Sequence, residues 1–367
     1  MSEEFTGPRI GVVGAGTRGR LFADVLVQQD ERLLAGFAET NEQTAEATRS
    51  TYKCPVFESH GKLFDEVPLD AVFVTTPDQD HRVPVIAAAE RGYHVLVEKP
   101  LATTAEDARA MSKAINDSGI KCMVAFENRW AAAYAEVRRR VVAGELGDVL
   151  SQTVRLSNTV AVPLRHLYWS ARTDASWFLM SHTLDLVHWF ANHPCDHVYA
   201  TGVKRELPRR GVPTWDIIQA NAYLRDGSTA SLESAWILPE GHPNLVDSYH
   251  QLLGTRGAIF VDGSSYGIRL STEDRSEFPR LRADITRRMI LDFVDYIKGG
   301  EATASLDLPG LRDGVNVTLA LCAIHSSLET REPVRIADVA KAAGFDSGDY
   351  PSDGTSEAGA QQNGTGS

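Results

Sequence analysis

The chain has 367 residues, of which 43% are hydrophobic and 23% charged, a composition typical of globular proteins. The length predicts two domains, and the net charge of −12 argues against a nucleic acid or an anionic membrane as partner. The acidic start is unlike a signal peptide, and no apolar run approaches the ~18–20 residues of a membrane span. The four separated cysteines lack metal-binding spacing. We therefore expect a reduced, cytoplasmic protein without a metal.

The first third of the chain alternates between short apolar runs and helical patterns. Strands are predicted at 10–13, 33–38, 71–75, 94–98 and 122–126, and helices near 19–29, 42–52, 83–91 and 105–116. Continuous apolar strands joined by helices are typical of a parallel sheet covered on both faces. The sequence therefore predicts a doubly wound α/β domain.

From about residue 147 the pattern changes to long runs of alternating polarity. These runs predict antiparallel strands with one solvated face, at 149–157, 217–224 and 229–237. Asp226-Gly227 predicts a hairpin between the last two, and a helix is expected at about 176–191.

Two further helices are predicted late in the chain, at about 286–298 and 311–328. Residues 346–367 are rich in Gly, Ser and Asp and contain no Lys or Arg. Such a composition cannot bury a core, so we expect an acidic, disordered tail.

A glycine loop, Gly14-Ala15-Gly16-Thr17-Arg18-Gly19, follows the first strand and opens a helical pattern. In this context Gly14 permits a sharp turn, Gly16 lets the backbone approach a pyrophosphate, and Gly19 lets helix and strand pack closely. The helix start at Thr17 offers free N–H groups to phosphates. The alternative is a glycine turn without a ligand.

Glu39 ends the second strand, 20 residues after Gly19. It is placed to accept hydrogen bonds from the adenosine ribose hydroxyls of a dinucleotide. Because a carboxylate repels a 2′-phosphate, we expect NAD rather than NADP as cofactor. Arg18, inside the loop, would soften that preference.

The segment Thr75-Thr76-Pro77-Asp78 ends the strand at 71–75, and we expect it to form a loop over the cofactor. Thr76, Pro77 and the following His81 are candidate cofactor contacts. The alternatives are a plain proline-containing turn and, for His81, a helix cap.

Glu98-Lys99-Pro100 follows the strand at 94–98. Pro100 keeps the backbone of Lys99 extended, so that the ammonium group projects in a defined direction. A lysine at this edge of a parallel sheet lies beside the crevice where ligands bind. We expect Lys99 to bind a substrate oxygen or to help transfer its proton, with Glu98 and Lys99 also beside the cofactor. The alternative is a surface lysine in a turn.

The helix at 176–191 places Phe178, His182, Asp185 and Trp189 on one face. An imidazole titrates near neutrality, so His182 can take the proton of a hydroxyl that is being oxidised. The alternative is that His182 is a hydrogen-bonded core residue.

Together these motifs resemble the glucose-fructose oxidoreductase / inositol dehydrogenase / rhizopine-catabolism (GFO/IDH/MocA) family over about residues 8–336. The resemblance rests on the glycine loop, on the segment 92–101 with its Glu98-Lys99-Pro100, and on three later motifs: Glu127-Asn128-Arg129-Trp130, Gly144-Glu145-Leu146-Gly147 and His182-Thr183-Leu184-Asp185.

The resemblance implies an α/β plus α+β fold. Residues 1–126 would form an N-terminal Rossmann domain with a doubly wound parallel sheet. Residues 127–340 would form a substrate-binding and oligomerisation domain on a large open, mostly antiparallel sheet, with the late helices packing back on the first domain. The assembly implied is a homo-oligomer, a dimer or a tetramer.

By this resemblance Lys99 and His182 match catalytic positions, and the substrate is a sugar, cyclitol or glycoside. Aromatic rings can stack on sugar faces, and charged donors can bind hydroxyls. The candidate substrate contacts are Lys99, Arg129, His166, Tyr168, Trp169, Arg172, Asp185 and His182. A helix connection with incidental aromatics is the alternative for residues 165–172.

One departure from the family pattern concerns the histidine. Many members carry an aspartate four residues before it and a glycine two before it, where this chain has Phe178 and Met180. A phenylalanine cannot orient an imidazole or stabilise its cation. Asp185 or Asp174 replaces the aspartate, or Lys99 carries more of the proton transfer.

Three functions remain open at this point. The leading one is hydride transfer between NAD and a secondary hydroxyl or ketone. A second keeps the cofactor but gives no net redox change, through transient oxidation with elimination or epimerisation. The third is a non-catalytic regulator that binds sugar or nucleotide, and fold alone does not separate these readings.

Overall fold

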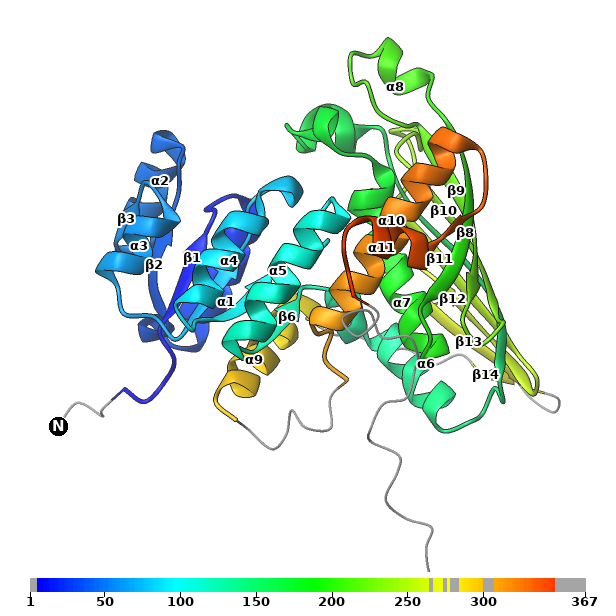
Figure 1. The fold of residues 1–367 in the computed structure, drawn as a ribbon, viewed down its shortest axis with the longest axis horizontal. Coiled ribbons are helices and arrows are strands. Elements are labelled where there is room, and N and C mark those ends of the chain that lie inside the picture. The colour runs from blue at the N-terminus through cyan, green and yellow to red at the C-terminus, as the bar shows by residue number, and fades with distance from the viewer. Residues whose placement is uncertain (1–4, 264–266, 273–275, 278–283, 300–306, 347–367) are drawn as a thin grey trace, which may run out of the picture.

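The computed structural model describes residues 5–263, 267–272, 276–277, 284–299 and 307–346. These residues form two sheets with helices between and around them (Figure 1). The predicted tail lies outside the described residues beyond Asp346. In the part of the chain described, no helix is long and apolar enough to cross a membrane.

The first sheet is fully parallel and has the order β3-β2-β1-β4-β5-β6. Its strands are β1 (Ile10–Val13), β2 (Leu34–Ala38), β3 (Val56–Phe57), β4 (Ala71–Val74), β5 (His94–Val97) and β6 (Cys122–Val124). The connecting helices are α1 (Thr17–Gln29), α2 (Glu42–Tyr52), α3 (His60–Glu66), α4 (Arg82–Glu90) and α5 (Ala105–Ser118). The predicted doubly wound sheet is confirmed. The prediction did not include β3 and α3.

Both faces of this sheet are buried, which explains the continuous apolar strands. On one face Phe73 of β4 contacts Phe22 of α1, with ring centroids 5.8 Å apart, and Phe293 of α9 (Ile285–Ile297), at 5.7 Å. On the other face Val72 and Val74 belong to the core that includes α4 and α5. The late helix α9 therefore packs on the first domain.

The second sheet has the order β14-β13-β12-β11-β7-β10-β9-β8-β15 within the described ranges. Every pair of adjacent strands in this sheet is antiparallel except the pair of β7 and β10, which is parallel. The large, mostly antiparallel sheet is therefore confirmed, and the turn at Asp226-Gly227 joins β9 to β10 as predicted. The strands are β7 (Val149–Asn158), β8 (Cys195–Val203), β9 (Ile217–Leu224), β10 (Thr229–Ala235), β11 (Val246–Gly254), β12 (Gly257–Asp262), β13 (Gly267–Thr272), β14 (Ser276–Glu277) and β15 (Val334–Arg335).

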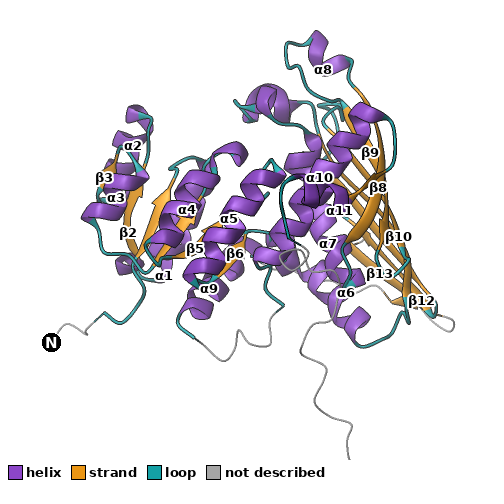
Figure 2. Cartoon of the chain, in the orientation of Figure 1, coloured by secondary structure: helices purple, strands orange, loops and turns teal. Residues whose placement is uncertain are grey.

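Helices cover the face of this sheet that is turned toward the first domain (Figure 2). The helices of this part of the chain are α6 (Ala132–Val142), α7 (Ser181–Ala191), α8 (Glu206–Arg209), α10 (Leu311–Thr330) and α11 (Ile336–Ala342). Of these, α10 contacts both α5 of the first domain and β8 of the second. The two domains therefore share a continuous packed boundary.

The helix predicted at 176–191 begins as a π-helical segment, η6 (Ser176–Met180), and continues as α7. A π turn has more residues than an α turn. The α-helical spacing used in the prediction therefore holds for residues of α7 but not for Phe178. This segment matters because Phe178 faces the candidate site.

Candidate active site

The glycine loop has the geometry that a dinucleotide site needs. Gly14 has a φ of +95°, and a Cβ there would lie 2.9 Å from the carbonyl oxygen of Thr75. A Cβ on Gly19 would overlap the carbonyl oxygen of Gly14, whereas a Cβ on Gly16 would meet nothing within 4 Å. Gly14 and Gly19 thus allow tight packing, and Gly16 leaves open space in front of the loop.

Helix α1 begins directly behind that space. Gly16 is its N-cap, and no side chain caps its first turn, in which the exposed Thr17 is the first residue. The first N–H groups of a helix have no partner within the helix. They are available to the phosphates of a bound dinucleotide.

A cavity of about 980 Å³ lies in front of the loop. Its volume is at the upper end of the range for cofactor and ligand pockets. Residues of the first domain form most of its wall, and two residues of the second domain complete it. They include Gly14, Gly16, Glu39, Thr76 and Pro77 on one side and Tyr168 and Arg172 on the other.

Glu39 lies at the end of β2 and lines this cavity. Its Oε2 accepts a hydrogen bond from the backbone N–H of Ala15 at 2.9 Å, and its Oε1 accepts one from Asn41 at 2.8 Å. The carboxylate is therefore held between the glycine loop and the start of α2. This is the place predicted for the ribose-binding group.

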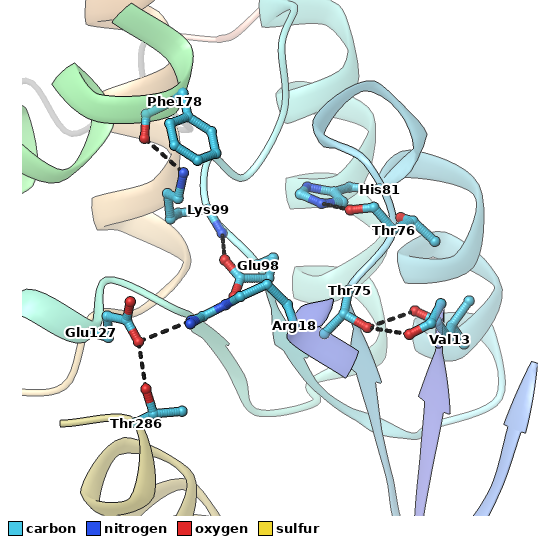
Figure 3. A network of polar contacts seen from close by, with 11 residues as sticks. Val13, Arg18, Thr75, Thr76, His81, Glu98, Lys99, Glu127, Phe178 and Thr286 are labelled. Atoms are coloured by element: carbon cyan, nitrogen blue, oxygen red, sulfur yellow. Dashed lines mark hydrogen bonds and ion pairs between the residues drawn. The ribbon is translucent and has the colours of Figure 1, made fainter. Parts of the chain in front are cut away.

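Arg18 does not face Glu39, contrary to the expectation that it softens the cofactor preference. Its guanidinium contacts the carboxylates of Glu98 and Glu127, the second at 2.9 Å. Glu127 also accepts a hydrogen bond from Thr286 Oγ1 at 2.8 Å (Figure 3). Arg18 thus links the glycine loop to the lysine segment and to the start of the second domain.

His81 does not line the cavity, contrary to its predicted cofactor contact. Its side chain is buried. Its Nε2 lies 3.1 Å from the carbonyl oxygen of Thr76, and its Nδ1 lies 2.9 Å from that of Pro100. Burial lowers the pKa of the imidazole. The histidine therefore fixes the loop that carries Thr76 against the segment that carries Lys99 (Figure 3).

Lys99 follows β5 and reaches across to the second domain (Figure 3). Its Nζ donates to the backbone carbonyl of Phe178 at 2.8 Å and lies 4.4 Å from the centre of the Phe178 ring. Its backbone N–H donates to Glu98 Oε2 at 3.0 Å. Burial lowers the pKa of Lys99, and the carboxylates of Asp78 and Glu98 oppose that shift.

His182 is half-buried at the start of α7. Burial lowers its pKa well below the ordinary value, and the positive charges of Lys99 and Arg18 lower it further. The imidazole is therefore neutral at pH 7 and lies near Lys99. Its Nδ1 is buried without a hydrogen-bond partner among the described residues.

Asp185 is not the missing partner of His182. Its two oxygens accept from Arg129, at 2.9 Å from Nε and 2.6 Å from Nη2. Arg129 also contacts Asp313 at 2.9 Å and the carbonyl oxygen of Asp307 at 3.1 Å. Both side chains of the pair are almost fully buried, so the geometry does not support their predicted contact with substrate.

Asp174 is not that partner either. Its Oδ1 accepts from the N–H and the hydroxyl of Ser176, at 2.8 and 2.6 Å, and its Oδ2 lies 3.3 Å from His325 Nε2. Asp174 thus fixes the start of the π-helical segment. The proposal that Asp174 or Asp185 replaces the family aspartate at Phe178 is not supported by the contacts of either residue.

The segment 165–172 divides between two places. Tyr168 and Arg172 line the cofactor cavity, and in the amide orientation that satisfies both side chains, Gln79 accepts from Arg172 at 3.1 Å. The Trp169 ring packs against the Phe178 ring, with centroids 6.3 Å apart. His166 is exposed. Of residues 165–172, Trp169 therefore packs against the ring that Lys99 contacts.

Two acidic residues that contact this site were absent from the predicted set. Glu127 binds Arg18, and its position directly before Asn128-Arg129-Trp130 was the only signal in the sequence. Asp78 is buried, and its carboxylate opposes the lowering of the pKa of Lys99. The sequence placed it in the cofactor loop but gave no sign that it would be buried.

The Rossmann sheet, its glycine loop and the carboxylate at the end of β2 place this chain in the class of nicotinamide-dependent dehydrogenases. Two family models match this chain: an oxidoreductase family with an NAD-binding Rossmann fold over residues 8–126, and the GFO/IDH/MocA C-terminal domain over residues 134–260. The chain belongs to the GFO/IDH/MocA family, and its cofactor is NAD.

Curated relatives include dehydrogenases of both cofactor types. The chain is 29% identical to D-xylose 1-dehydrogenase (NADP(+)) 2 of Haloferax volcanii over 343 residues, which is 89% of this chain and 98% of that protein. It is 28% identical to scyllo-inositol 2-dehydrogenase (NAD(+)) of Bacillus subtilis over 203 residues, 54% of this chain and 57% of that protein. The second match spans little more than half of that relative.

Solved structures share the fold. Scyllo-inositol dehydrogenase from Lactobacillus casei, solved with NAD(H) and scyllo-inositol, has a TM-score of 0.76 and 19% identity, covering 90% of this chain and 100% of that one. At this identity the likeness concerns the fold alone.

Proposed function

We propose that this protein is an NAD-dependent dehydrogenase of a sugar, cyclitol or glycoside that interconverts a secondary hydroxyl and a ketone. The proposal is supported by the cavity in front of the glycine loop and by the buried Lys99, which follows β5 and whose charge acts on His182. The relatives named above act on xylose and inositol, which are polyhydroxylated substrates.

The residues in front of α1 fit the cofactor. The space before Gly16, the uncapped start of α1 and the carboxylate of Glu39 suit a pyrophosphate followed by a ribose. When bound there, NAD supplies the hydride acceptor for the alcohol carbon.

Lys99 and His182 would handle the proton of the reacting hydroxyl. A neutral His182 has a free Nδ1 that can accept this proton. Lys99 can donate a hydrogen bond to the same oxygen and stabilise negative charge that develops on it. To do so, Nζ would exchange its contact with the Phe178 carbonyl for one with substrate.

Two buried polar atoms of the second domain are candidates for binding the remaining hydroxyls. Trp236 packs against Phe178 with ring centroids 5.8 Å apart. The Nε1 of Trp236 and the Oδ1 of Asn158, at the ends of the parallel strands β10 and β7, are buried without partners in the described ranges. Hydroxyl groups of a bound ligand would satisfy such atoms.

A redox-neutral reaction is the second candidate, because His182 lacks the carboxylate that would stabilise its protonated form. In that case NADH would form only transiently and would not accumulate. Assembly as a homo-oligomer and a cytoplasmic location remain predictions. Light scattering coupled to size-exclusion chromatography tests the assembly.

The function is tested by following absorbance at 340 nm with NAD and a panel of sugars, inositols and aryl glycosides. Growth of NADH with one substrate class, absent in Lys99→Met, supports a dehydrogenase. A flat trace with substrate converted, as seen by mass spectrometry, supports the redox-neutral enzyme. A flat trace without conversion, despite NAD binding, rules out both activities on that panel.

A further inference from the structure

Asp78 occupies a position that the activity described above does not use. It is the first residue of the short 3-10 turn η2 (Asp78–Asp80), which follows β4. Lys99 follows the neighbouring strand β5, and Val74 pairs with Val97 in the sheet. The two side chains therefore start from adjacent strand ends on the edge where the cofactor cavity lies.

The Asp78 carboxyl group is buried, with 6% of the residue exposed. Its Oδ2 has no hydrogen-bond partner among the described residues. A buried polar atom of this kind requires an explanation, because leaving it unpaired is costly. The side chain of Thr173, from the second domain, also faces it.

The charged groups that act on Asp78 are Lys99 and Glu98. Burial raises the pKa of Asp78 to about 7, and the positive charge of Lys99 limits the rise. In return, Asp78 is the strongest of the carboxylates that keep the pKa of Lys99 from falling further, ahead of Glu98. Among the described residues, Arg18, Glu127 and His182 also act on Lys99 or are acted on by it.

His182 has no carboxylate partner among the described residues, because the nearby Asp185 and Asp174 bind other groups. The buried carboxylate that acts on this part of the site lies next to Lys99 instead. We propose that Asp78 is a positioning residue that sets the charge of Lys99.

The consequence is a coupled pair. With Asp78 ionised, Lys99 holds its proton more firmly and acts as a hydrogen-bond donor to the substrate oxygen. With Asp78 protonated, that support is lost and Lys99 gives up its proton more readily. Two groups coupled in this way titrate as a unit.

The coupling can be measured without turnover, so that its failure is separable from failure of the proposed function on which the role of Lys99 rests. The protein is labelled with [4-¹³C]aspartate, and the Asp78 carboxyl signal is assigned by its loss in Asp78→Asn, or in Asp78→Ser if the first variant does not fold. Its chemical shift is then followed from pH 4 to 9.

We expect the Asp78 signal to titrate at least about two pH units above an ordinary aspartate, near 3.9. In Lys99→Met the midpoint should rise by a further pH unit or more, because a positive charge has been removed. The signal of the exposed Asp117, paired with Lys113 on α5, is the control and should not differ between wild type and Lys99→Met. A midpoint near 4, or one that Lys99→Met leaves unchanged, overturns the proposal.

A second experiment measures turnover, with a substrate identified among the sugars, inositols and aryl glycosides named above. In Asp78→Asn the apparent pKa of the basic limb of kcat/KM for oxidation, where Lys99 loses its proton, should fall by about one unit or more, while the Kd of NADH changes less than about threefold. Asp117→Asn is the matched control and should keep the wild-type profile. A purely structural role for Asp78 would lower thermal stability without moving this limb, and that result contradicts the proposal.

Discussion

The ammonium group of Lys99 donates a hydrogen bond to the backbone carbonyl of Phe178, at 2.8 Å, and lies over the ring of the same residue. One residue belongs to the Rossmann domain and the other to the π-helical segment of the second domain. The contact therefore crosses the domain boundary at the candidate active site. π-helical turns occur frequently at functional sites, and here the turn presents Phe178 to Lys99 with both its carbonyl and its ring.

Replacing Lys99 by methionine should strongly lower turnover while cofactor binding persists. The variant keeps the apolar stem over Phe178 but loses the ammonium group. Loss of a positioned proton-transfer or hydrogen-bonding group costs about 10²–10⁴-fold in rate. We expect kcat to fall in that range and the Kd of NADH, from fluorescence titration, to stay within about threefold. Activity within tenfold of wild type would contradict the role given to Lys99.

Alanine substitutions at Gly16 and Gly19 should have different effects, one on the affinity for NADH and the other on the stability of the fold. A methyl group at Gly16 projects into the open cavity, so Gly16→Ala should leave the melting temperature unchanged and raise the Kd of NADH by tenfold or more. At Gly19 the methyl group collides with the Gly14 carbonyl, and overpacking of this kind costs about 1–3 kcal/mol or more. Thermal melts and NADH titrations of both variants test this. Unimpaired NADH binding by Gly16→Ala would place the pyrophosphate elsewhere.

Glu39→Gln should weaken the preference for NAD over NADP. The amide oxygen still accepts from a backbone N–H of the loop, but the charge that repels a 2′-phosphate is removed. We expect the ratio of kcat/KM for NAD to that for NADP to fall by about tenfold, equal to ~1.4 kcal/mol. Glu42→Gln, at an exposed carboxylate nearby, is the control. An unchanged ratio would mean that Glu39 does not face the ribose.

The Arg129–Asp185 pair should contribute to stability rather than to catalysis. Arg129→Met leaves the buried Asp185 and the nearby Asp313 without their partner. Removing one member of a buried ion pair costs about 3–5 kcal/mol. Urea unfolding measures this loss, with Arg49→Met as the exposed control, where about 1 kcal/mol or less is expected. A loss below 1 kcal/mol at Arg129 contradicts the structural assignment.

Because of His250, the free energy of unfolding should decrease as the pH falls below about 6.5. Burial lowers its pKa to about 3, while the unfolded chain titrates at the ordinary value near 6.5. The unfolded state therefore takes up the proton first. The stabilisation is complete above pH 6.5 and is lost as the pH falls toward the folded-state pKa.

The difference between wild type and His250→Gln isolates this contribution, because other titrating groups are shared. At pH 4.5, about two units below the unfolded value, the stability advantage of wild type over the variant should be about 3 kcal/mol smaller than at pH 7. Urea midpoints across this range provide the measurement. His166→Gln, at an exposed histidine, should show no such change.

The fold was largely predictable wherever a strand is apolar throughout or alternates cleanly. Strands β1, β4 and β5 meet the first condition, and β9 and β10 the second. Strand β11 meets neither, because its inward-facing His250 is polar and bonds to Gln152 at 2.9 Å. Strand β3 has only two residues, too few to show a period.

The site residues also fall into those that the local sequence predicts and those that it does not. The roles of Gly14, Gly19 and Glu39 follow from local spacing, because neighbouring strand ends meet at one edge of a parallel sheet. The partner of Asp185 is 56 positions away in sequence, and nothing local distinguishes a buried carboxylate from one that faces substrate. The burial of Asp78 likewise depends on the second domain, which contributes Thr173.

The edge strand β6 is completed by a much later part of the chain. The N–H of Val124 donates to the carbonyl of Pro309 at 2.9 Å, and Met123 bridges to Gly310, just before α10. A fragment cut after residue 126 would leave this edge open, and exposed edges pair with other chains. The nucleotide-binding half is thus not a detachable module. Domain exchange with a relative would have to transfer the segment at 309–310 together with residues 1–126, or accept aggregation of the recombinant half.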